Sequence, residues 1–542
     1  MSTLSPFQRG IQLLSENEPE RAREVLIAVR DEGGPDAPAA ARFLAYIERS
    51  ARRLGSAIEI LLASLTEFGE DAASLAQLAE LYMALGKGPE AISAAERSLE
   101  VEPDNAVTAL NLTIWRSNLS NEPREIKPAF EAWSSRFLSA PDNSNPLCKQ
   151  RVSGRAAHAR IRIGYISGDL SNHPVRYFIE PYFRAHDASR FDVHAFMTGQ
   201  EDDISGVLKE WVPNWHNVEQ LDDDALLALI KALEIDILVD LSGHTEASRM
   251  GIFAARAAPV QVTWWGFVHT LGMPEIDYRL TDWATCPEGA EAFYTESLCR
   301  MRCHTAYVPP VNCDNEYPAP WRNNQYVTMV SLNHTRKISD AALEAWCNIL
   351  QRNPDSGLIV ITSETSEAAI QEHFVPRLEE KRFPMDRVSA VPRLTMLEFM
   401  NIGAVADFAL DSFPVSGGVT TLHSLWMGLP VLTLSPPVPI AMQTYSGNTL
   451  RLVGMDDCIA SSASDLVDRA THWIQHPAVI ETLRHSARAA LSNSPFMDHL
   501  GRVRELEACF LEMWKRLEAG TPVTHIDSET VMSFNQLDMP AV

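Results

Sequence analysis

The stretch DSFPVSGGVTTLHSLWMGLPVL, residues 411–432, decides the fold. It starts at the end of a short β-rich run, passes through Gly417 and Gly418, and continues into a segment that reads as a helix. In doubly wound α/β folds, ligands bind beyond the carboxyl ends of strands, where the dipole of a helix start attracts anions. The glycines let a ligand approach the backbone, and the hydroxyls of Thr420 and Thr421 can donate to phosphate oxygens. The stretch therefore predicts a diphosphate site, with an ordinary turn and helix cap as the alternative.

Other short β-rich runs surround this stretch, and helical segments separate many of them. These runs are IRIGYISGDL, DVHAFMTG, IDILVDLSG, VQVTWWGF, YVTMVSLN, GLIVITSE, DFALDSF and PVLTLSP. Alternation of this kind predicts parallel sheets with helices on both faces. We expect two doubly wound, Rossmann-like α/β lobes, residues 161–320 and 321–520. The second is expected to include a closing helix around residues 502–517, and residues 521–542 to form a tail.

Residues 1–140 have a different composition, rich in Ala, Leu, Glu and Arg, with apolar residues at helical spacing. They repeat at a period near the ~34 residues of tetratricopeptide repeats, most clearly over residues 72–105. There, small residues such as Ala79 and Ala95 let two helices approach closely. A generic helical bundle is the alternative. A repeat stack would offer a concave surface to a protein or peptide and could also join copies of the chain. Residues 141–160 lose the periodicity, which predicts a linker.

Composition narrows the class of protein. At 542 residues the chain is long enough for two or three domains. Its formal net charge of −25 argues against nucleic acid as a partner, because no basic excess is available to neutralise phosphates. No stretch reaches the roughly 18 uninterrupted apolar residues of a membrane helix. The eight cysteines are scattered rather than arranged as a disulfide framework, so we expect a cytoplasmic protein.

A second strand end carries a cluster of potential cations. In VSLNHTRKISDAAL, the residues His334, Arg336 and Lys337 precede a helix that Ser339 is expected to cap. A lysine at this place could neutralise a leaving diphosphate in a transferase that uses no metal. The alternative is a basic loop that only faces water.

Three loops of the first lobe each bring a histidine to one edge of the predicted sheet. Asn172 and His173 follow IRIGYIS, His244 follows IDILVDLS, and His269 follows VQVTWWGF. A neutral imidazole there could take or orient the proton of a hydroxyl group. Each histidine taken singly is more often structural, but the shared placement favours a role in the cleft.

Two groups of residues resemble metal ligands and are interpreted otherwise. Cys299, Cys303 and His304, with Cys286 and Cys313 nearby, miss the paired spacing of zinc sites. Residues 222–224, DDD, precede a helical run and are better explained as a cap with favourable charge. We expect neither a catalytic metal nor another cofactor.

Taken together, these motifs resemble bacterial relatives of the O-linked N-acetylglucosamine transferases and the SPINDLY protein O-fucosyltransferases. The resemblance spans nearly the whole chain and rests on helical repeats followed by IRIGYISGDLSNHP, DILVDLSGHT, APVQVTWWGF, IDYRLTD, NHTRK and ALDSFPVSGGVTTLHSLWMGLPVLTL. It implies the GT-B fold, with the donor held mainly by the second lobe and the acceptor lying across the cleft near the repeats. The implied reaction is inverting transfer of a sugar from a nucleotide diphosphate to Ser or Thr hydroxyls of proteins.

The resemblance also assigns residues. It matches His173 to a histidine near the reacting groups, Lys337 to the lysine that neutralises the diphosphate, and the pair Thr420 and Thr421 to hydroxyls on the phosphates. His334 falls where the first family has a glutamine. Phe399 falls where relatives carry a histidine that stacks on the base, and an aromatic ring can stack there too.

Departures from the family pattern leave the donor open. Val419 replaces a histidine of the N-acetylglucosamine enzymes, Met396 replaces a lysine near the base, and Ser424 stands where relatives hold the ribose with Asp or Glu. UDP-N-acetylglucosamine is our first choice of donor, followed by UDP-glucose and GDP-fucose, and a bacterial surface or flagellar protein is one acceptor that the resemblance suggests. Two rival functions stay open: a non-catalytic repeat scaffold, and a GT-B enzyme that acts on a small molecule or glycan.

Overall fold

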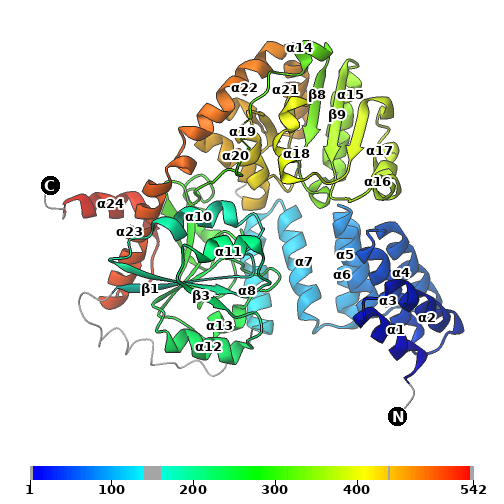
Figure 1. The fold of residues 1–542 in the computed structure, drawn as a ribbon, viewed down its shortest axis with the longest axis horizontal. Coiled ribbons are helices and arrows are strands. Elements are labelled where there is room, and N and C mark those ends of the chain that lie inside the picture. The colour runs from blue at the N-terminus through cyan, green and yellow to red at the C-terminus, as the bar shows by residue number, and fades with distance from the viewer. Residues whose placement is uncertain (1–3, 139–159, 314, 438–439, 538–542) are drawn as a thin grey trace.

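The computed structural model describes residues 4–138, 160–313, 315–437 and 440–537. It confirms the predicted fold class: helical repeats are followed by two α/β lobes, each built on a parallel sheet. Figure 1 shows the C-terminal lobe above the N-terminal lobe. The repeats lie beside the N-terminal lobe and beneath the C-terminal lobe. The linker predicted at residues 141–160 lies outside the described residues except for Arg160.

Small residues and side-chain caps explain the helical domain. Ala57, Ala79 and Ala95 are fully or almost fully buried between helices, and a Cβ on Gly10 would lie 2.7 Å from the Leu26 side chain. The carboxylate of Asp71 caps α5 by accepting from Ser74 N at 2.9 Å. The helices are α1 (Pro6–Ser15), α2 (Pro19–Glu32), α3 (Ala37–Ser50), α4 (Leu54–Phe68), α5 (Ala72–Ala84), α6 (Gly88–Val101), α7 (Ala106–Leu119), η1 (Pro123–Glu125) and α8 (Ile126–Phe137).

The N-terminal lobe has an eight-stranded sheet in the order β14-β7-β6-β5-β4-β1-β2-β3. Its strands are short and largely buried on both faces, as a parallel sheet covered by helices requires. The elements are β1 (Ile161–Ser167), α10 (Arg176–Ala185), β2 (Phe191–Met197), α11 (Asp203–Lys209), β3 (Asn214–Asn217), α12 (Asp223–Ala232), β4 (Ile237–Asp240), α13 (Met250–Ala254), β5 (Val260–Thr263), β6 (Tyr278–Asp282), η2 (Ala290–Phe293) and β7 (Ser297–Met301).

The C-terminal lobe has a six-stranded parallel sheet in the order β10-β9-β8-β11-β12-β13. This order reverses between β8 and β11, and ligands of doubly wound sheets bind at such a switch point. The elements are α14 (Trp321–Asn324), β8 (Val327–Ser331), η3 (Thr335–Lys337), α15 (Asp340–Arg352), β9 (Ser356–Ile361), α16 (Glu367–His373), α17 (Val375–Glu380), η4 (Met385–Arg387), β10 (Val388–Val391), α18 (Met396–Met400), η5 (Ile402–Ala404), β11 (Phe408–Leu410), α19 (Val419–Trp426), β12 (Val431–Leu434), α20 (Ala441–Leu452), η6 (Asp456–Cys458), β13 (Ile459–Ala460), α21 (Ala463–Gln475), α22 (Pro477–Ser492) and η7 (Pro495–Met497).

The end of the chain returns to the first lobe, which differs from the expectation for the closing helix. Helix α23 (His499–Glu518) was expected within the second lobe, but Leu506, Phe510 and Met513 pack into the core of the N-terminal sheet. Strand β14 (Ile526–Asp527), expected to be part of a tail, pairs with β7, and α24 (Ser528–Leu537) follows it. The reason is that the apolar stripe of α23 completes the cover of the first sheet.

The repeats contact both lobes. Phe130 of α8 is fully buried against His244 and Phe267 of the N-terminal lobe. A Cβ on Gly272 would lie 2.3 Å from the backbone of Phe130, so only glycine allows this approach. On the other lobe, Arg377 donates from Nη1 to the carbonyl of Leu85 at 2.6 Å. The repeats therefore contact the N-terminal lobe through α8 and the C-terminal lobe through the end of α5.

Within the described part of the chain, none of the helices is long and apolar enough to cross a membrane.

Candidate active site

The carboxylate of Asp411 organises the loops at the switch point of the C-terminal sheet. Strands β8 and β11 are parallel neighbours, so the loops that follow them meet at one edge. Asp411 is buried and accepts hydrogen bonds from Gly417 N at 2.9 Å and from Thr433 Oγ1 at 2.6 Å. It also accepts from Asn333 Nδ2 at 2.6 Å. This carboxylate fixes the glycine loop onto the loop after β8.

Asn333 and Lys337 connect that loop to the predicted diphosphate site. Asn333 Oδ1 accepts from Thr420 Oγ1 at 3.0 Å, and Lys337 Nζ donates to the carbonyl of Ser416 at 2.8 Å. Burial lowers the pKa of Lys337 to about 8, although Asp411 favours the charged form. The structure thus brings Lys337, Gly417 and Thr420 together, as the sequence predicts, with a lysine that is cationic at neutral pH.

The start of α19 completes the group formed by Lys337, Gly417 and Thr420, and we call the whole group the cradle. Thr421 Oγ1 lies 2.8 Å from Ser446 Oγ of α20, which donates to the carbonyl of Gly417 at 3.2 Å. A Cβ on Gly417 would lie 2.7 Å from Thr421 Oγ1, whereas no atom lies within 4 Å of the Cβ position at Gly418. The backbone at Gly418 is therefore open to a ligand, and the one at Gly417 is packed.

The other residues predicted to bind the nucleotide-sugar differ in how accessible their side chains are. Ser424 is buried, and its hydroxyl donates to the carbonyl of Thr420 at 2.8 Å, within α19. Phe399 of α18 is half-buried, with its ring 6.0 Å from that of His423. His334 is exposed, and partial desolvation with the nearby cations Arg336 and Lys337 lowers its pKa to about 4. Their contacts with a donor remain predictions.

His423 joins the two lobes and escaped the sequence analysis. Its Nδ1 lies 2.7 Å from the hydroxyl of Tyr307, and its ring meets that of Tyr177 edge to face at 4.9 Å. Burial lowers the pKa of His423 to about 3, so the ring is neutral. A single histidine inside a helical run gives no signal in the sequence. Asp411 and Ser446 were missed as well, and Asn333 was placed at the strand end before Lys337 but was given no role of its own.

His173 lies in the loop after β1, where its imidazole contacts neighbouring residues of the same loop. Its Nδ1 accepts from Val175 N at 3.4 Å and lies 3.7 Å from the carboxylate of Asp169. Burial lowers the pKa of His173, and Asp169 opposes this effect. The neighbouring Asn172 is exposed, and its backbone N–H donates to Asp202. The side chain of His173 is 44% exposed, so it is accessible to a substrate.

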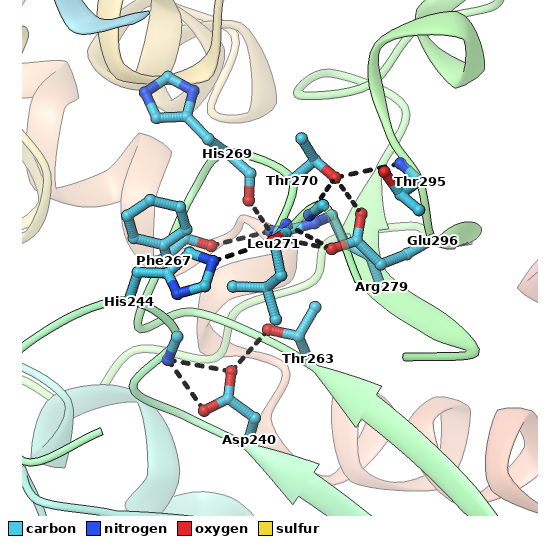
Figure 2. Close-up of polar contacts among 12 residues, drawn as sticks. Asp240, His244, Thr263, Phe267, His269, Thr270, Leu271, Arg279, Thr295 and Glu296 are labelled. Carbon is cyan, nitrogen blue, oxygen red and sulfur yellow. Dashed lines mark hydrogen bonds and ion pairs between the residues drawn. The ribbon is translucent and has the colours of Figure 1, made fainter. Parts of the chain in front are cut away.

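His244 and His269 lie together, at the junction with the repeats. Figure 2 shows both on the loops around Leu271, above Asp240 and beside the buried pair Arg279 and Glu296. His244 Nε2 lies 2.9 Å from the carbonyl of Leu271, and His269 Nε2 lies 2.8 Å from Asn118 Oδ1 of α7. Burial lowers their pKa values to about 4 and about 3. Both rings are neutral and bonded, and their assignment to an acceptor cleft remains a prediction.

The residues first considered as metal ligands have other contacts. Asp222 caps α12 by accepting from Ala225 N at 2.8 Å, as expected. Cys303 Sγ donates to the carbonyl of Thr305 at 3.2 Å, and His304 pairs with Asp282 rather than with a cysteine.

A cavity of about 870 Å³ lies in the same lobe but at the other edge of its sheet. Its lining includes Tyr326, Gly357 and Val388, at the amino ends of β8, β9 and β10. The Asp411 loops follow carboxyl ends, so this cavity is separate from the cradle.

The chain is similar to known proteins over both lobes. The family described as glycosyl transferase family 41 matches residues 148–309 and 310–505. The probable UDP-N-acetylglucosamine–peptide N-acetylglucosaminyltransferase SPINDLY of Solanum lycopersicum is 30% identical over 77% of this chain and 45% of its own length. The chain spans about half the length of the curated relatives it matches. A mutant of the Thermobaculum terrenum O-GlcNAc transferase superposes with a TM-score of 0.82 and 26% identity, covering 96% of this chain and 100% of that structure.

Proposed function

Because the chain belongs to glycosyl transferase family 41, we propose that it is a protein O-glycosyltransferase that moves a sugar from a nucleotide diphosphate to Ser or Thr hydroxyls, with inversion. The observation that carries this proposal is the cradle at the switch point. There Lys337, Thr420 and the open backbone of Gly418 surround the start of α19. Cations, hydroxyls and a helix start are the groups that hold a diphosphate.

The cradle would act by stabilising charge on the leaving group. As the bond from the anomeric carbon to the diphosphate breaks, negative charge grows on the phosphate oxygens. Lys337, the hydroxyls of Thr420 and Thr421, and the α19 dipole would meet that charge from loops that Asp411 and Asn333 already fix. The Thr420 hydroxyl would turn its one donor from Asn333 Oδ1 to a phosphate oxygen. His173, accessible across the cleft, would orient the acceptor hydroxyl.

We propose N-acetylglucosamine as the sugar and UDP as its carrier, followed by UDP-glucose and GDP-fucose. Support comes from the names of the relatives, which are UDP-N-acetylglucosamine–peptide transferases from plants and from Caenorhabditis elegans. The half-buried ring of Phe399 could stack on the base. The Ser424 hydroxyl is bonded within its helix, so a ribose would need another partner.

A protein acceptor is supported by the repeats, because α7 and α8 pack against the lobes that would hold the sugar. Gln443 of α20, near the cradle, donates to the carbonyls of Asn118 and Ser120 at the end of α7. A chain bound along the repeats would therefore lead toward the cleft.

The test is a screen of UDP-, GDP- and CMP-sugars for thermal stabilisation, followed by transfer to a library of Ser/Thr peptides. Binding to the folded state raises the melting temperature by linkage, and we expect the largest rise with UDP-N-acetylglucosamine. A chain that none of these donors stabilises would be a scaffold without a donor site. Transfer to free sugars but to no peptide would favour an enzyme that acts on glycans.

A further inference from the structure

Asp282 and His304 form a histidine–carboxylate pair that the proposed mechanism leaves unused. Asp282 ends β6 and is 1% exposed, while His304 follows β7. His304 Nδ1 and its backbone N–H both point to Asp282 Oδ2, and Thr285 N donates to Oδ1 at 2.8 Å. Burial would raise the pKa of Asp282, but His304 and Thr285 more than offset it and hold the pKa low. The carboxylate is therefore ionised.

The surroundings hold this imidazole in one position. The indole N–H groups of Trp264 and Trp265 donate to the carbonyl of His304 at 3.0 and 3.1 Å. The ring of Tyr445 meets the His304 ring edge to face, at 6.4 Å and 87°. Because Tyr445 belongs to α20, the pair lies where the first lobe faces the second.

Helix α20 connects the pair to the proposed diphosphate cradle. Tyr445 directly precedes Ser446, whose hydroxyl contacts Thr421 and the carbonyl of Gly417. A cavity of about 30 Å³ is lined by His304, Tyr445, Trp265 and Arg279, among others. A water molecule needs roughly 10–15 Å³ of such space, so a hydroxyl group fits. Arg279 Nε, buried and without a hydrogen-bond partner among the described residues, belongs to a side chain that lines this space.

Hydrogen bonding assigns different tautomers to His173 and His304. His173 Nδ1 accepts from a backbone N–H, so its neutral ring carries the proton on Nε2 and can donate to an oxygen. His304 Nδ1 donates to a carboxylate, so its neutral ring has a lone pair on Nε2 and can accept a proton. His244 and His269 are excluded, because their Nε2 atoms already have partners.

We infer that His304, oriented by Asp282, is the general base that removes the proton of the acceptor hydroxyl, and that the small cavity beside Tyr445 receives that hydroxyl. This inference rests on the proposed function. The hydroxyl proton moves to His304 Nε2 as the acceptor oxygen bonds to the anomeric carbon. The bond from that carbon to the diphosphate oxygen breaks, and its electron pair leaves with the nucleoside diphosphate. Asp282 stabilises the imidazolium that forms, which afterwards gives its proton to water.

The test compares His304→Gln with a matched control, His186→Gln. His186 Nδ1 also pairs with a buried carboxylate, Glu507 of α23, but His186 precedes the amino end of β2, whereas His304 follows the carboxyl end of β7. With UDP-N-acetylglucosamine and the Ser/Thr peptide library, we expect His304→Gln to lower kcat by roughly 10²- to 10⁴-fold. The thermal shift with UDP should persist, because the cradle is intact. The control measures how far kcat falls when a buried histidine–carboxylate pair that has no proposed role in catalysis is broken.

The pH profile and chemical rescue separate a base from a structural residue. Asp282 bonds the imidazole of His304 directly, and Tyr445, Arg279 and Tyr294 line the same small cavity. A general base acts only in its unprotonated form, so the acid limb of kcat/KM reports the protonation of the base. The acid limb of kcat/KM in the wild type should therefore vanish in His304→Gln and persist in His186→Gln. Added imidazole should partly restore His304→Gly.

Two outcomes are decisive in opposite directions. A kcat of His304→Gln within about threefold of the wild type, or an unchanged acid limb, would overturn the assignment of the base, since a general base contributes at least about 10²-fold. Wild-type protein that binds donors but transfers to no hydroxyl would instead overturn the proposed function.

Discussion

The two lobes share one topology but treat their switch points in opposite ways. In the C-terminal lobe, Asp411 anchors the glycine loop by accepting from Gly417 N, and the backbone at Gly418 in that loop stays open to a ligand. In the N-terminal lobe, the reversal lies between β1 and β4, and Asp240 at the end of β4 bonds Gly243 N at 2.8 Å and Thr263 Oγ1 at 2.8 Å. The repeat helix α8 then covers the loop that follows. The elements packed over a switch point, rather than the sheet itself, therefore decide which of its loops stay open to a ligand: α8 covers the loop after β4, while His173 in the loop after β1 remains accessible.

Deleting the helical repeats, which cover the N-terminal switch point, should have the largest effect on the protein. Deletion of residues 1–138 exposes the apolar surface around Phe267 and His244 that Phe130 buries, so we expect an aggregating protein. Deletion of residues 1–35 removes only α1 and α2 and should leave a folded enzyme that still binds UDP. Solubility, circular dichroism and the UDP thermal shift distinguish the two truncations. A soluble, donor-binding protein without residues 1–138 would show that the repeats are an independent module.

Lys337→Ala tests the open switch point. Loss of the cation that faces the leaving diphosphate should lower kcat by about 10²- to 10³-fold, similar to removal of a key charge-stabilising donor. The melting temperature should change little, because the lysine is partly exposed and its ammonium bonds a loop carbonyl, that of Ser416, rather than a core group. Lys381→Ala, which removes a lysine paired with Asp340 and Glu344 of α15, is the control and should keep normal turnover. Equal activity of the two variants would remove Lys337 from the mechanism.

The pKa of Lys337 predicts how UDP binding depends on pH. Because burial holds this pKa at about 8, the ammonium is charged below pH 8 and loses its proton as pH rises through that value. UDP affinity should therefore fall between about pH 8 and 9.5, by at most about tenfold per pH unit. Titration calorimetry of the wild type and of Lys337→Met measures this slope. A slope that survives in Lys337→Met would assign the titration to another group.

Thr420→Val should have the smallest effect. It removes one hydroxyl from Asn333 and from the phosphates while keeping the shape of the side chain. A single hydrogen bond contributes about 1 kcal/mol, which corresponds to roughly fivefold in UDP affinity. Calorimetry would measure the difference, with Thr482→Val on the exposed face of α22 as a control. A loss above a hundredfold would mean that the hydroxyl organises the whole loop.

The sequence was most informative where one local pattern sufficed. The β-rich run before Asp411, the two glycines and the helical segment after them already predict a strand, a phosphate-binding turn and a helix start, since each depends on neighbours in the chain. Lys337 could be predicted as well, because it follows a second strand that the alternating pattern places in the same sheet. The alanines within residues 72–105 predicted paired helices in the same way, because helical spacing is also a property of neighbouring residues.

Other features depended on contacts between distant segments. The role of Asn333 as a bridge from Asp411 to Thr420, the link from His423 to Tyr307, and the pairing of His304 with Asp282 join residues that are far apart in the chain. The closing helix α23 is another case: its apolar stripe fits either sheet, and only packing selects the first.

The sequence by itself therefore determined the helical repeats and the two parallel sheets, and it placed Lys337, Gly418 and Thr420 at strand ends, because periodicity and turn chemistry are local properties. Only the tertiary structure decided which of the predicted histidines lie open to a substrate and which are sealed. His173 is accessible, while His244 and His269 are bonded beneath α7 and α8. Burial and hydrogen-bond partners set the charge and tautomer of an imidazole, and both depend on segments that meet only when the chain has folded.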